Sequence, residues 1–371
     1  MKQKTILLIF NLFLLGIPGC SNSEYISSTF LELANEIGEK HIIDKSLDVF
    51  ELDIEKKNGK WIIKGETLNR EVYLDIEKLS DSLFHKMEIK FNFQLLPDSS
   101  LRDSLYGIVN VSVTPVKEKP SHASQMIDQI KMGEKVTLLR YDSGWYLSQN
   151  QYKYIGWVNK TALHVYDSTK IKNWTTEKKI RVKSIRDFIY SKQDANSMPV
   201  CDIILNNKLK LLTEYRNWSK VQLPDGRSGY IKNSVYKNNS KTHSSSQIQM
   251  ETAYQLMGSP YLWGGNSING NDCSGFIHNI YENSGINLPR DARQQAELGK
   301  LIIPNNNWSN VKPGDLLFFG NENKITHVGM STGGKEFIHQ GGMVRVNSLD
   351  SSSNKFAPRR NKTFQFIKRL N

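Results

Sequence analysis

Hydrophobic and polar residues alternate along residues 106–236, in short segments that glycine and other turn-forming residues separate. Alternation with a period of two predicts antiparallel strands that each bury one face. The pattern repeats after 73 positions, a shift that superimposes Val136, Leu138, Leu139 and Trp145 on Leu209, Leu211, Leu212 and Trp218. We therefore predict two related small β-barrels, at residues 106–170 and 176–236.

Residues 24–105 combine helical and strand-like periods. Helical spacing is found around residues 30–37 and 76–83, and alternation around residues 52–54, 61–63 and 89–93. The turn signal Asn58-Gly59 separates two of the strand-like runs. This segment is predicted to be a small α+β domain, and no catalytic combination of residues is evident in it.

A polar segment at residues 237–247, which contains His243, is predicted to be a solvated linker to a last domain at residues 248–371. In this domain the hydrophobic spacing from Phe276 to Tyr281 predicts a helix from about Cys273 to Ser284. Asp272 is a natural N-cap for that helix, and Gly285 a natural stop. The fold class of the whole chain is therefore α+β.

Two strand-like segments follow this helix and flank Thr332-Gly333-Gly334. If these three residues form the loop of a hairpin, His327 lies directly opposite His339 on one face. A two-residue Gly333-Gly334 loop would instead place His327 opposite Gln340.

Residues 1–20 have the order of an export signal. Lys2 and Lys4 precede an apolar run from Ile6 to Leu15, which is too short for a comfortable membrane span. Cys20 directly follows Gly19 and resembles the lipidated cysteine of bacterial lipoprotein signals, although Pro18 is unusual at its position. We expect an exported lipoprotein that a lipid on Cys20 anchors to a membrane of a bacterial cell envelope. Simple secretion with a free or trimmed Cys20 is the alternative.

The net charge of +12 is unevenly distributed. Residues 24–105 carry 17 acidic and 11 basic side chains, whereas residues 106–371 carry 20 acidic and 36 basic ones. The positive part favours anionic partners, such as cell-wall polymers with carboxylates. No basic stripe with interleaved aromatic residues is present, so nucleic acid is not an expected partner.

The chain has three cysteines, Cys20, Cys201 and Cys273, and this odd number excludes a complete disulfide framework. Cys201 lies among apolar strand residues and is expected to be a small buried hydrophobic residue. A Cys201–Cys273 disulfide is an open alternative that would silence Cys273 as a nucleophile.

Cys273 is a candidate nucleophile, because the start of a helix favours a thiolate over a thiol. His327 and His339 lie downstream in strand-like sequence and can supply a base and a group that orients it. His278 lies about 140° round the helix from Cys273 and is expected to be structural. The pattern predicts a cysteine peptidase that needs no cofactor and no metal.

Five ordered motifs resemble the NlpC-type, papain-like family of bacterial cell-wall cysteine peptidases. They are Tyr261-Leu-Trp-Gly-Gly, Asp272-Cys-Ser-Gly-Phe, Leu288-Pro-Arg-Asp, Pro313-Gly-Asp-Leu-Leu-Phe and His327-Val-Gly. In both repeats a tryptophan is followed eleven residues later by a Gly-aromatic-aliphatic sequence, which resembles the bacterial SH3-like domain. This combination is similar to the γ-D-glutamyl-L-diamino acid endopeptidase group, which cleaves murein peptides between D-glutamate and the diamino acid.

The resemblance implies a role for each matching residue. Cys273 would be the nucleophile, His327 the base and His339 the third catalytic residue. Tyr261 would lie near the oxyanion. The residues expected to contact the substrate peptide include Trp263, Asp272, Ser274 and Asp291.

One residue departs from the group. Its first SH3-like domain supplies a glutamate that binds the free amine of the substrate's L-alanine, whereas this chain has Gln125 in Pro120-Ser-His-Ala-Ser-Gln-Met. A neutral amide binds an ammonium more weakly, so we expect a relaxed preference for a free amine, unless Asp128 compensates. The aromatic partner of the amine would be Tyr152 or Tyr154, and Tyr154 is our choice.

Three other functions fit parts of the pattern. The SH3-like domains could make the chain a peptidoglycan-binding lipoprotein with a weak or inactive peptidase domain, although all three catalytic positions are filled. A zinc site would need a fourth ligand beside Cys273, His327 and His339. The same thiolate could also transfer its acyl group to an amine. A monomer is expected.

Overall fold

The computed structural model describes residues 21–237 and 244–370, and the side chains from residue 23 on. The predicted export signal with Cys20 lies outside the described residues, as does His243. The chain forms two compact units, which divide between Asp98 and Ser99. No helix among the described residues is long and apolar enough to cross a membrane.

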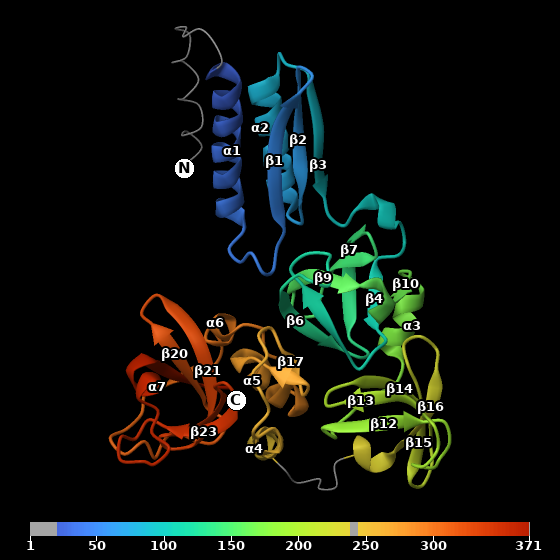
Figure 1. The fold of residues 1–371 in the computed structure, drawn as a ribbon, viewed down its shortest axis with the longest axis vertical. Coiled ribbons are helices and arrows are strands. Elements are labelled where there is room, and N and C mark those ends of the chain that lie inside the picture. Colours follow the sequence, from blue (N-terminus) through green and yellow to red (C-terminus); the bar gives the residue numbers. More distant parts are fainter. Residues whose placement is uncertain (1–20, 238–243, 371) are drawn as a thin grey trace. The chain divides into compact units, whose positions relative to one another are not determined.

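The first unit is a small α+β fold (Figure 1). Its elements are α1 (Ser21–His41), β1 (Phe50–Lys57), β2 (Lys60–Thr67), α2 (Arg70–Phe84) and β3 (Ile89–Leu95). The predicted Asn58-Gly59 turn joins β1 and β2, and both residues have positive φ, as such two-residue hairpins require. The β3 strand runs parallel to β2, with α2 as the crossover. Both helices contact each other and the sheet.

The second unit begins with a barrel whose strand order is β10-β4-β7-β8-β9-β5-β6. These strands are β4 (Tyr106–Val109), β5 (Val113–Lys117), β6 (Met126–Lys131), β7 (Lys135–Asp142), β8 (Trp145–Gln149), β9 (Ile155–Asn159) and β10 (Leu163–Tyr166). Its core includes Val136, Leu138 and Val158, which come from alternate positions of β7 and from β9. We call it the first barrel.

Helix α3 (Lys170–Thr176) leads to the second barrel, with strand order β11-β14-β15-β16-β12-β13. Its strands are β11 (Lys179–Arg181), β12 (Arg186–Tyr190), β13 (Pro199–Ile204), β14 (Lys208–Glu214), β15 (Trp218–Gln222) and β16 (Ser228–Lys232). The order matches that of the first barrel except that β10 has no counterpart, and a shift of 73 residues carries β8 onto β15 and β9 onto β16 residue for residue. Burial differs most at one repeated position, because Leu139 is buried whereas Leu212 is 40% exposed.

The last part of the chain packs helices on a six-stranded sheet of order β19-β24-β20-β21-β22-β23. Its helices are α4 (Ser245–Gln255), α5 (Cys273–Asn283), α6 (Ala292–Gln295) and α7 (Pro358–Thr363). The sheet strands are β19 (Lys300–Ile302), β20 (Leu316–Asn321), β21 (Lys324–Gly333), β22 (Glu336–Gln340), β23 (Val344–Ser348) and β24 (Phe364–Arg369), and β17 (Asn266–Ser267) pairs with β18 (Gly270–Asn271). The α5 helix ends one residue before the predicted Ser284.

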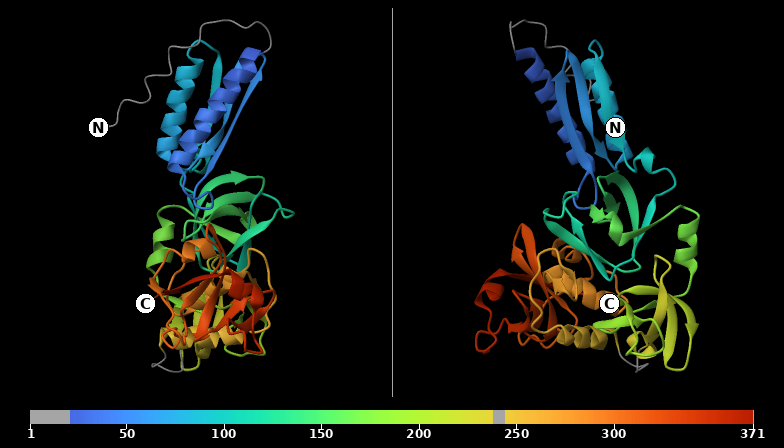
Figure 2. Two further views of the ribbon diagram at one scale, coloured as in Figure 1. Left: turned by 90° about the vertical axis from the view of Figure 1, so that its left-hand side faces the viewer. Right: turned by 45° about the vertical axis from the view of Figure 1, so that its right-hand side comes forward.

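Helix α5 is buried between this sheet and the barrels. Its apolar residues Phe276 and Ile280 pack with Phe318 of β20 and Val328 of β21. This packing sets the start of α5 against the strands that carry the two predicted catalytic histidines. Figure 2 shows α5 and the sheet from two further sides.

The other end of α5 carries Glu282, which is 1% exposed and contacts both barrels. Lys131 of β6 lies 3.1 Å from one of its oxygens, and Lys208 of β14 lies 3.3 Å from the other. Burial opposes ionisation of Glu282, but the two lysine charges outweigh burial and hold the pKa of Glu282 well below its ordinary value. The nucleophile's helix is therefore fixed to both barrels by one carboxylate.

Candidate active site

Cys273 is the first residue of α5, as the sequence predicts. Asp272 is the N-cap, and its Oδ1 accepts hydrogen bonds from the Gly275 backbone N–H at 2.8 Å and from the Ser274 hydroxyl at 3.2 Å. A Cβ at Gly275 would lie 2.0 Å from the carbonyl oxygen of Gly265, so only glycine allows this close approach. The glycines of the two motifs therefore bring the first turn of α5 onto the Tyr261-Leu-Trp-Gly-Gly segment.

His327 and His339 contact each other, but through a different register from either one predicted. Met330 pairs with Ile338, and a bulge between Ser331 and Gly333 shifts the strands. Continuing this register places Gly329, rather than His327, opposite His339. Both predicted registers were wrong, because the strands turn at Gly334-Lys335 rather than at either predicted loop, and the bulge then shifts the pairing by one residue.

The two imidazoles nevertheless meet diagonally across the strands. His327 Nε2 lies 2.7 Å from His339 Nδ1. A Cβ at Gly329 would lie 3.0 Å from His339 Cβ, so the glycine between them leaves room for the two rings. The hydrogen bond through Nε2 leaves the Nδ1 atom of His327 for the thiol.

Asn347 of β23 extends this chain of hydrogen bonds, and sequence reasoning missed it. Its Oδ1 atom lies 2.9 Å from His339 Nε2, and its Nδ2 donates to the Lys355 carbonyl at 3.1 Å. Because a carbonyl oxygen only accepts, His339 must carry its hydrogen on Nε2, and His339 Nδ1 then accepts from His327 Nε2–H. A signal was present in the Gly341-Gly342 turn, whose hairpin places Asn347 diagonally from His339.

Burial sets the protonation of the catalytic pair. It raises the pKa of Cys273 to about 11, with a smaller contribution from Asp272, while the backbone N–H groups of Val328 and Ser274 favour the thiolate. Burial also lowers the pKa of His327 well below 6.5, and the positive charge of Arg360 adds to this effect. Burial therefore favours the uncharged thiol and the neutral imidazole, and it opposes the expected helix-start stabilisation of a thiolate.

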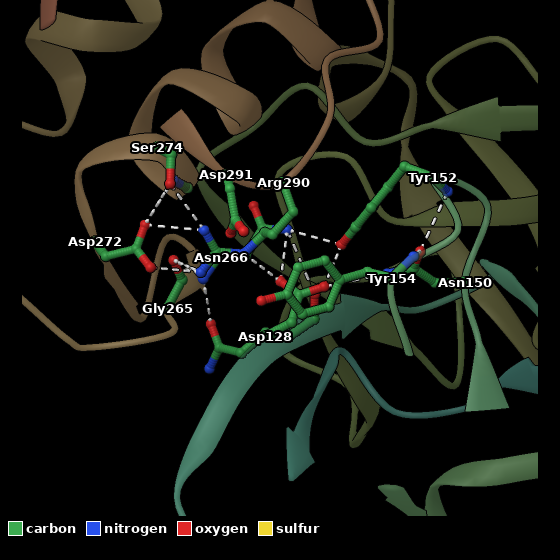
Figure 3. Close-up of polar contacts among 12 residues, drawn as sticks. Asp128, Asn150, Tyr152, Tyr154, Gly265, Asn266, Asp272, Ser274, Arg290 and Asp291 are labelled. Carbon is green, nitrogen blue, oxygen red and sulfur yellow. Dashed lines mark hydrogen bonds and ion pairs between the residues drawn. The ribbon is translucent and has the colours of Figure 1, made fainter. Parts of the chain in front are cut away.

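Arg290 links the first barrel to the catalytic helix (Figure 3). Its Nε donates to Asp128 Oδ1 of β6 at 2.6 Å. Its Nη1 donates to Asp272 and to the Ser274 hydroxyl at 3.0 Å each, and its Nη2 donates to Asp272 at 2.5 Å. Asp272 and Ser274, which were predicted to contact the substrate, therefore bind the buried Arg290 instead. The sequence analysis included Arg290 in the motif Leu288-Pro-Arg-Asp but assigned no role to it.

Asp128 is not available as a substitute for the missing glutamate. It is 0% exposed, and its two oxygens accept from Arg290, Asn150, Asn266 and the Tyr152 hydroxyl. Burial raises its pKa, and the charge of Arg290 opposes that rise. With every acceptor position engaged inside the protein, Asp128 cannot compensate for Gln125.

The same network separates the two candidate tyrosines. Tyr152 donates its hydroxyl to Asp128, and its ring packs edge-on against His278 at 5.1 Å between centroids. Tyr154 lies beside Arg290 and Asp291 (Figure 3), and burial together with the Asp291 charge raises its pKa, so its hydroxyl stays protonated. Tyr154 therefore remains the candidate for the aromatic partner, while Tyr152 is structural, as is the buried His278.

Three further residues predicted to contact the substrate are exposed. Tyr261 is 37% and Trp263 is 63% exposed. Burial raises the pKa of Tyr261 to about 12, and Cys273 adds to the rise. Gln125 is exposed, and the next residue, Met126, touches the same segment, because a Cβ at Gly264 would lie 2.5 Å from the Met126 carbonyl oxygen.

Cys201 and Cys273 are both free thiols, so the alternative disulfide is not formed. Burial and Asp202 raise the pKa of Cys201 to about 11. Among the described residues, no group of three or more His, Cys, Asp or Glu side chains is arranged to hold a metal ion.

Comparison with known proteins gives the same assignment. The NlpC/P60 family profile matches residues 258–360, and the bacterial SH3 domain profile matches residues 112–164. The chain is 30% identical to a γ-D-glutamyl-L-lysine dipeptidyl-peptidase of Bacillus subtilis, over 57% of this chain and 71% of that protein. It is 24% identical to dipeptidyl-peptidase 6 of Lysinibacillus sphaericus, over 66% of this chain and 92% of that protein.

Two solved structures share the fold. An NlpC/P60 family protein from Bacillus cereus superposes with a TM-score of 0.60 and 21% identity, over 71% of this chain and 99% of that one. An NlpC/P60 endopeptidase from Photobacterium damselae has a TM-score of 0.51 and 17% identity, over 73% and 72%. The family profile and the 30% identity to the Bacillus subtilis protein, over 71% of its length, show that the chain is a cysteine peptidase of the NlpC/P60 family.

Proposed function

We propose that the enzyme hydrolyses the bond between γ-D-glutamate and the diamino acid in murein peptides, in turnover or recycling of the cell wall. The observation that carries this proposal is the bridge from Asp128 through Arg290 to Asp272. It holds the first barrel beside the nucleophile, so the barrel forms a wall on one side of the site. Such a wall favours short peptides over long chains. Relatives named γ-D-glutamyl-L-lysine dipeptidyl-peptidase support the substrate class.

Tyr154 and Asp291 are the proposed binding pair for the amino end of the peptide. Asp291 is 27% exposed at its side chain and shares its charge with Arg293 at 3.1 Å. An ammonium group can bind this carboxylate and the Tyr154 hydroxyl together. Gln125 and Trp263 complete the proposed substrate contacts. Both are exposed, Trp263 within the Tyr261-Leu-Trp-Gly-Gly segment and Gln125 next to Met126, which touches that segment.

The proposed reaction begins with proton transfer from the Cys273 thiol to His327 Nδ1, while His339 and Asn347 hold the imidazole in position. The thiolate attacks the γ-carbonyl carbon of D-glutamate. Backbone N–H of Cys273, unpartnered at the first turn of the helix, and the Tyr261 hydroxyl donate to the oxyanion. His327 then gives its proton to the departing amine, and a thioester remains on Cys273.

Water completes the cycle. His327 takes a proton from a water molecule, which attacks the thioester and releases L-Ala-γ-D-Glu and the free thiol. Burial favours the uncharged thiol and imidazole, which are the forms from which this scheme starts.

Mass spectrometry of products from L-Ala-γ-D-Glu-diamino acid peptides tests the proposal. The wild type is expected to yield L-Ala-γ-D-Glu and a free diamino acid, and the Cys273→Ala variant is expected to be folded and inactive. Cleavage at another bond, or turnover retained by Cys273→Ala, would refute the assignment. Binding of intact peptidoglycan without any cleavage would instead favour the wall-binding alternative.

We also propose that the enzyme is an exported monomer anchored through a lipid on Cys20. Support for export and for the lipid anchor comes from the sequence of residues 1–20 alone. Expression in bacteria should place the wild type in the membrane fraction and a Cys20→Ser variant in the soluble envelope fraction. Light scattering of the detergent-free Cys20→Ser protein measures the oligomeric state.

A further inference from the structure

Arg360 of α7 has a half-buried side chain close to the catalytic residues. Among residues 21–237 and 244–370, no side chain or carbonyl forms a hydrogen bond or ion pair with this guanidinium. The guanidinium carbon lies 5.7 Å from the centroid of the Phe319 ring. Burial lowers the pKa of Arg360, as expected for a cation withdrawn from water without a counter-ion.

Comparable arginines of this domain are paired. Arg290 is bound by Asp128 and Asp272. Arg369 binds both oxygens of Asp315, at 2.6 and 2.7 Å. A partly buried cation without a partner is costly, so the fold is expected to retain Arg360 in this state for a ligand that supplies the negative charge.

The position of Arg360 identifies which ligand group it can reach. The Phe319 ring that Arg360 contacts also packs against the catalytic base, because the ring centroids of Phe319 and His327 lie 5.7 Å apart. In agreement with this position, the charge of Arg360 lowers the pKa values of His327 and His339, and the charges of Cys273 and Tyr261 act on Arg360. It therefore lies within electrostatic reach of the nucleophile and of the base that protonates the leaving amine. Arg290 also acts on Cys273, but its donors are engaged with the protein, so Arg360 has the free donors.

We propose that Arg360 binds a carboxylate of the diamino acid that leaves with the amine, and so determines specificity on the leaving-group side. This inference rests on the proposed function. The amino end of the peptide is assigned to the barrel side, and α7 packs on β20, the sheet side of the catalytic residues (Figure 1). The carboxylate has two sources. It is the α-carboxylate of a terminal diamino acid, or the side-chain carboxylate of a diaminodicarboxylic acid.

Four tripeptides separate these sources. One pair is L-Ala-γ-D-Glu-L-Lys with a free or an amidated terminus. The other pair contains diaminopimelate with an amidated α-carboxyl group, and its side-chain carboxylate is free or amidated. Arg360 is expected to favour the free acid of at least one pair about tenfold or more in kcat/KM, since charge-assisted hydrogen bonds are the strong ones. The pair that responds identifies the source.

Arg360→Gln is expected to reduce that preference to about twofold or less, and Arg360→Lys, which keeps the charge but not the planar fork, to retain part of it. Arg359→Gln removes the same charge from an exposed neighbour and should leave the preference within about twofold. Thermal melting checks that each variant is folded.

The proposal is overturned if Arg360→Gln lowers kcat/KM for acids and amides by the same factor, because Arg360 would then act only on the catalytic charges. It is also overturned if the wild type cleaves acids and amides equally well. Failure of the proposed function looks different, since the wild type would then release no L-Ala-γ-D-Glu from any of the four peptides.

Discussion

His327 Nε2 lies 2.7 Å from His339 Nδ1, and the only hydrogen in that contact belongs to His327, because His339 donates its own to Asn347. The order of donors therefore runs from the base toward the sheet edge. It leaves His327 Nδ1 unprotonated and ready to accept a proton. Asn347 thus fixes the catalytic tautomer of His327 indirectly, through its hydrogen bond with His339.

Asn347→Ala should lower kcat/KM by about one to two orders of magnitude, since loss of a buried hydrogen bond costs about 1–3 kcal/mol. Asn347→Asp should raise the pKa of the histidine pair and move the acidic limb of the pH–rate profile upward. The pH–rate profile separates this positioning role from a structural one. Asn323→Ala, an exposed residue of the same domain, is the control. An unshifted limb in Asn347→Asp would contradict the role.

The buried histidines should make stability fall in acid. His339 has its pKa lowered by burial to about 4, and that of His278 is lowered to about 3. Since an unfolded histidine titrates near 6.5, the unfolded chain binds more protons between pH 6.5 and 4. The stabilising effect of the neutral His339 is complete above pH 6.5 and is lost as pH falls, by roughly 3 kcal/mol in total.

Urea unfolding at several pH values measures this effect. His339→Gln should flatten the dependence between pH 6.5 and 4, whereas His164→Gln, at an exposed site, should not. If the free energy of unfolding depends on pH equally steeply in the two variants, His339 does not cause the loss of stability in acid.

Removal of the Asp128 charge should destabilise the protein strongly. Asp128→Asn leaves Arg290 with half of its buried counter-charge, and breaking such a pair costs about 3–5 kcal/mol. Glu214→Gln breaks an exposed pair with Lys237 and should cost less than about 1 kcal/mol. Urea denaturation of the two variants makes the comparison. A cost for Asp128→Asn as small as that for Glu214→Gln would mean that the bridge contributes little.

Gln125→Glu should restore preference for a free amino terminus. An exposed added charge contributes about 0.2–1 kcal/mol, so the ratio of kcat/KM for free over acetylated peptide should rise about two- to fivefold. Gln193→Glu adds the same charge at an exposed site of the second barrel and should leave the ratio unchanged. If Gln125→Glu also leaves the ratio unchanged, the amine is bound by other residues, with Tyr154 and Asp291 as the candidates.

Sequence patterns were sufficient for features that depend on local spacing. The 73-residue repeat, the Asn58-Gly59 hairpin and the start of α5 at Cys273 each follow from a short run of residues, and each is present. Hydrophobic periodicity carries this information because neighbouring residues of a helix or strand must share one buried face.

Features that depend on irregular or distant contacts were not accessible in the same way. The turn at Gly334-Lys335 and the bulge between Ser331 and Gly333 set the register without a distinctive residue type, so the opposition of His327 and His339 was predicted wrongly. The Arg290–Asp128 pair joins residues 162 positions apart in different domains. No local pattern relates two such residues, and only the folded surfaces of the barrel and the peptidase domain bring them together.

Glu282 has a consequence for how this protein can be divided. Because its carboxylate is held by one lysine from each barrel, a peptidase domain separated from the barrels would leave the buried Glu282 without either lysine. Lys131 would lose Glu282, and Lys208 would keep only Glu134, at 3.8 Å. The peptidase domain is therefore not expected to be stable when it is produced without the barrels. Exchange of either barrel for one from another protein would require a lysine at the matching place, so the three domains are expected to be inherited, engineered and lost as a set.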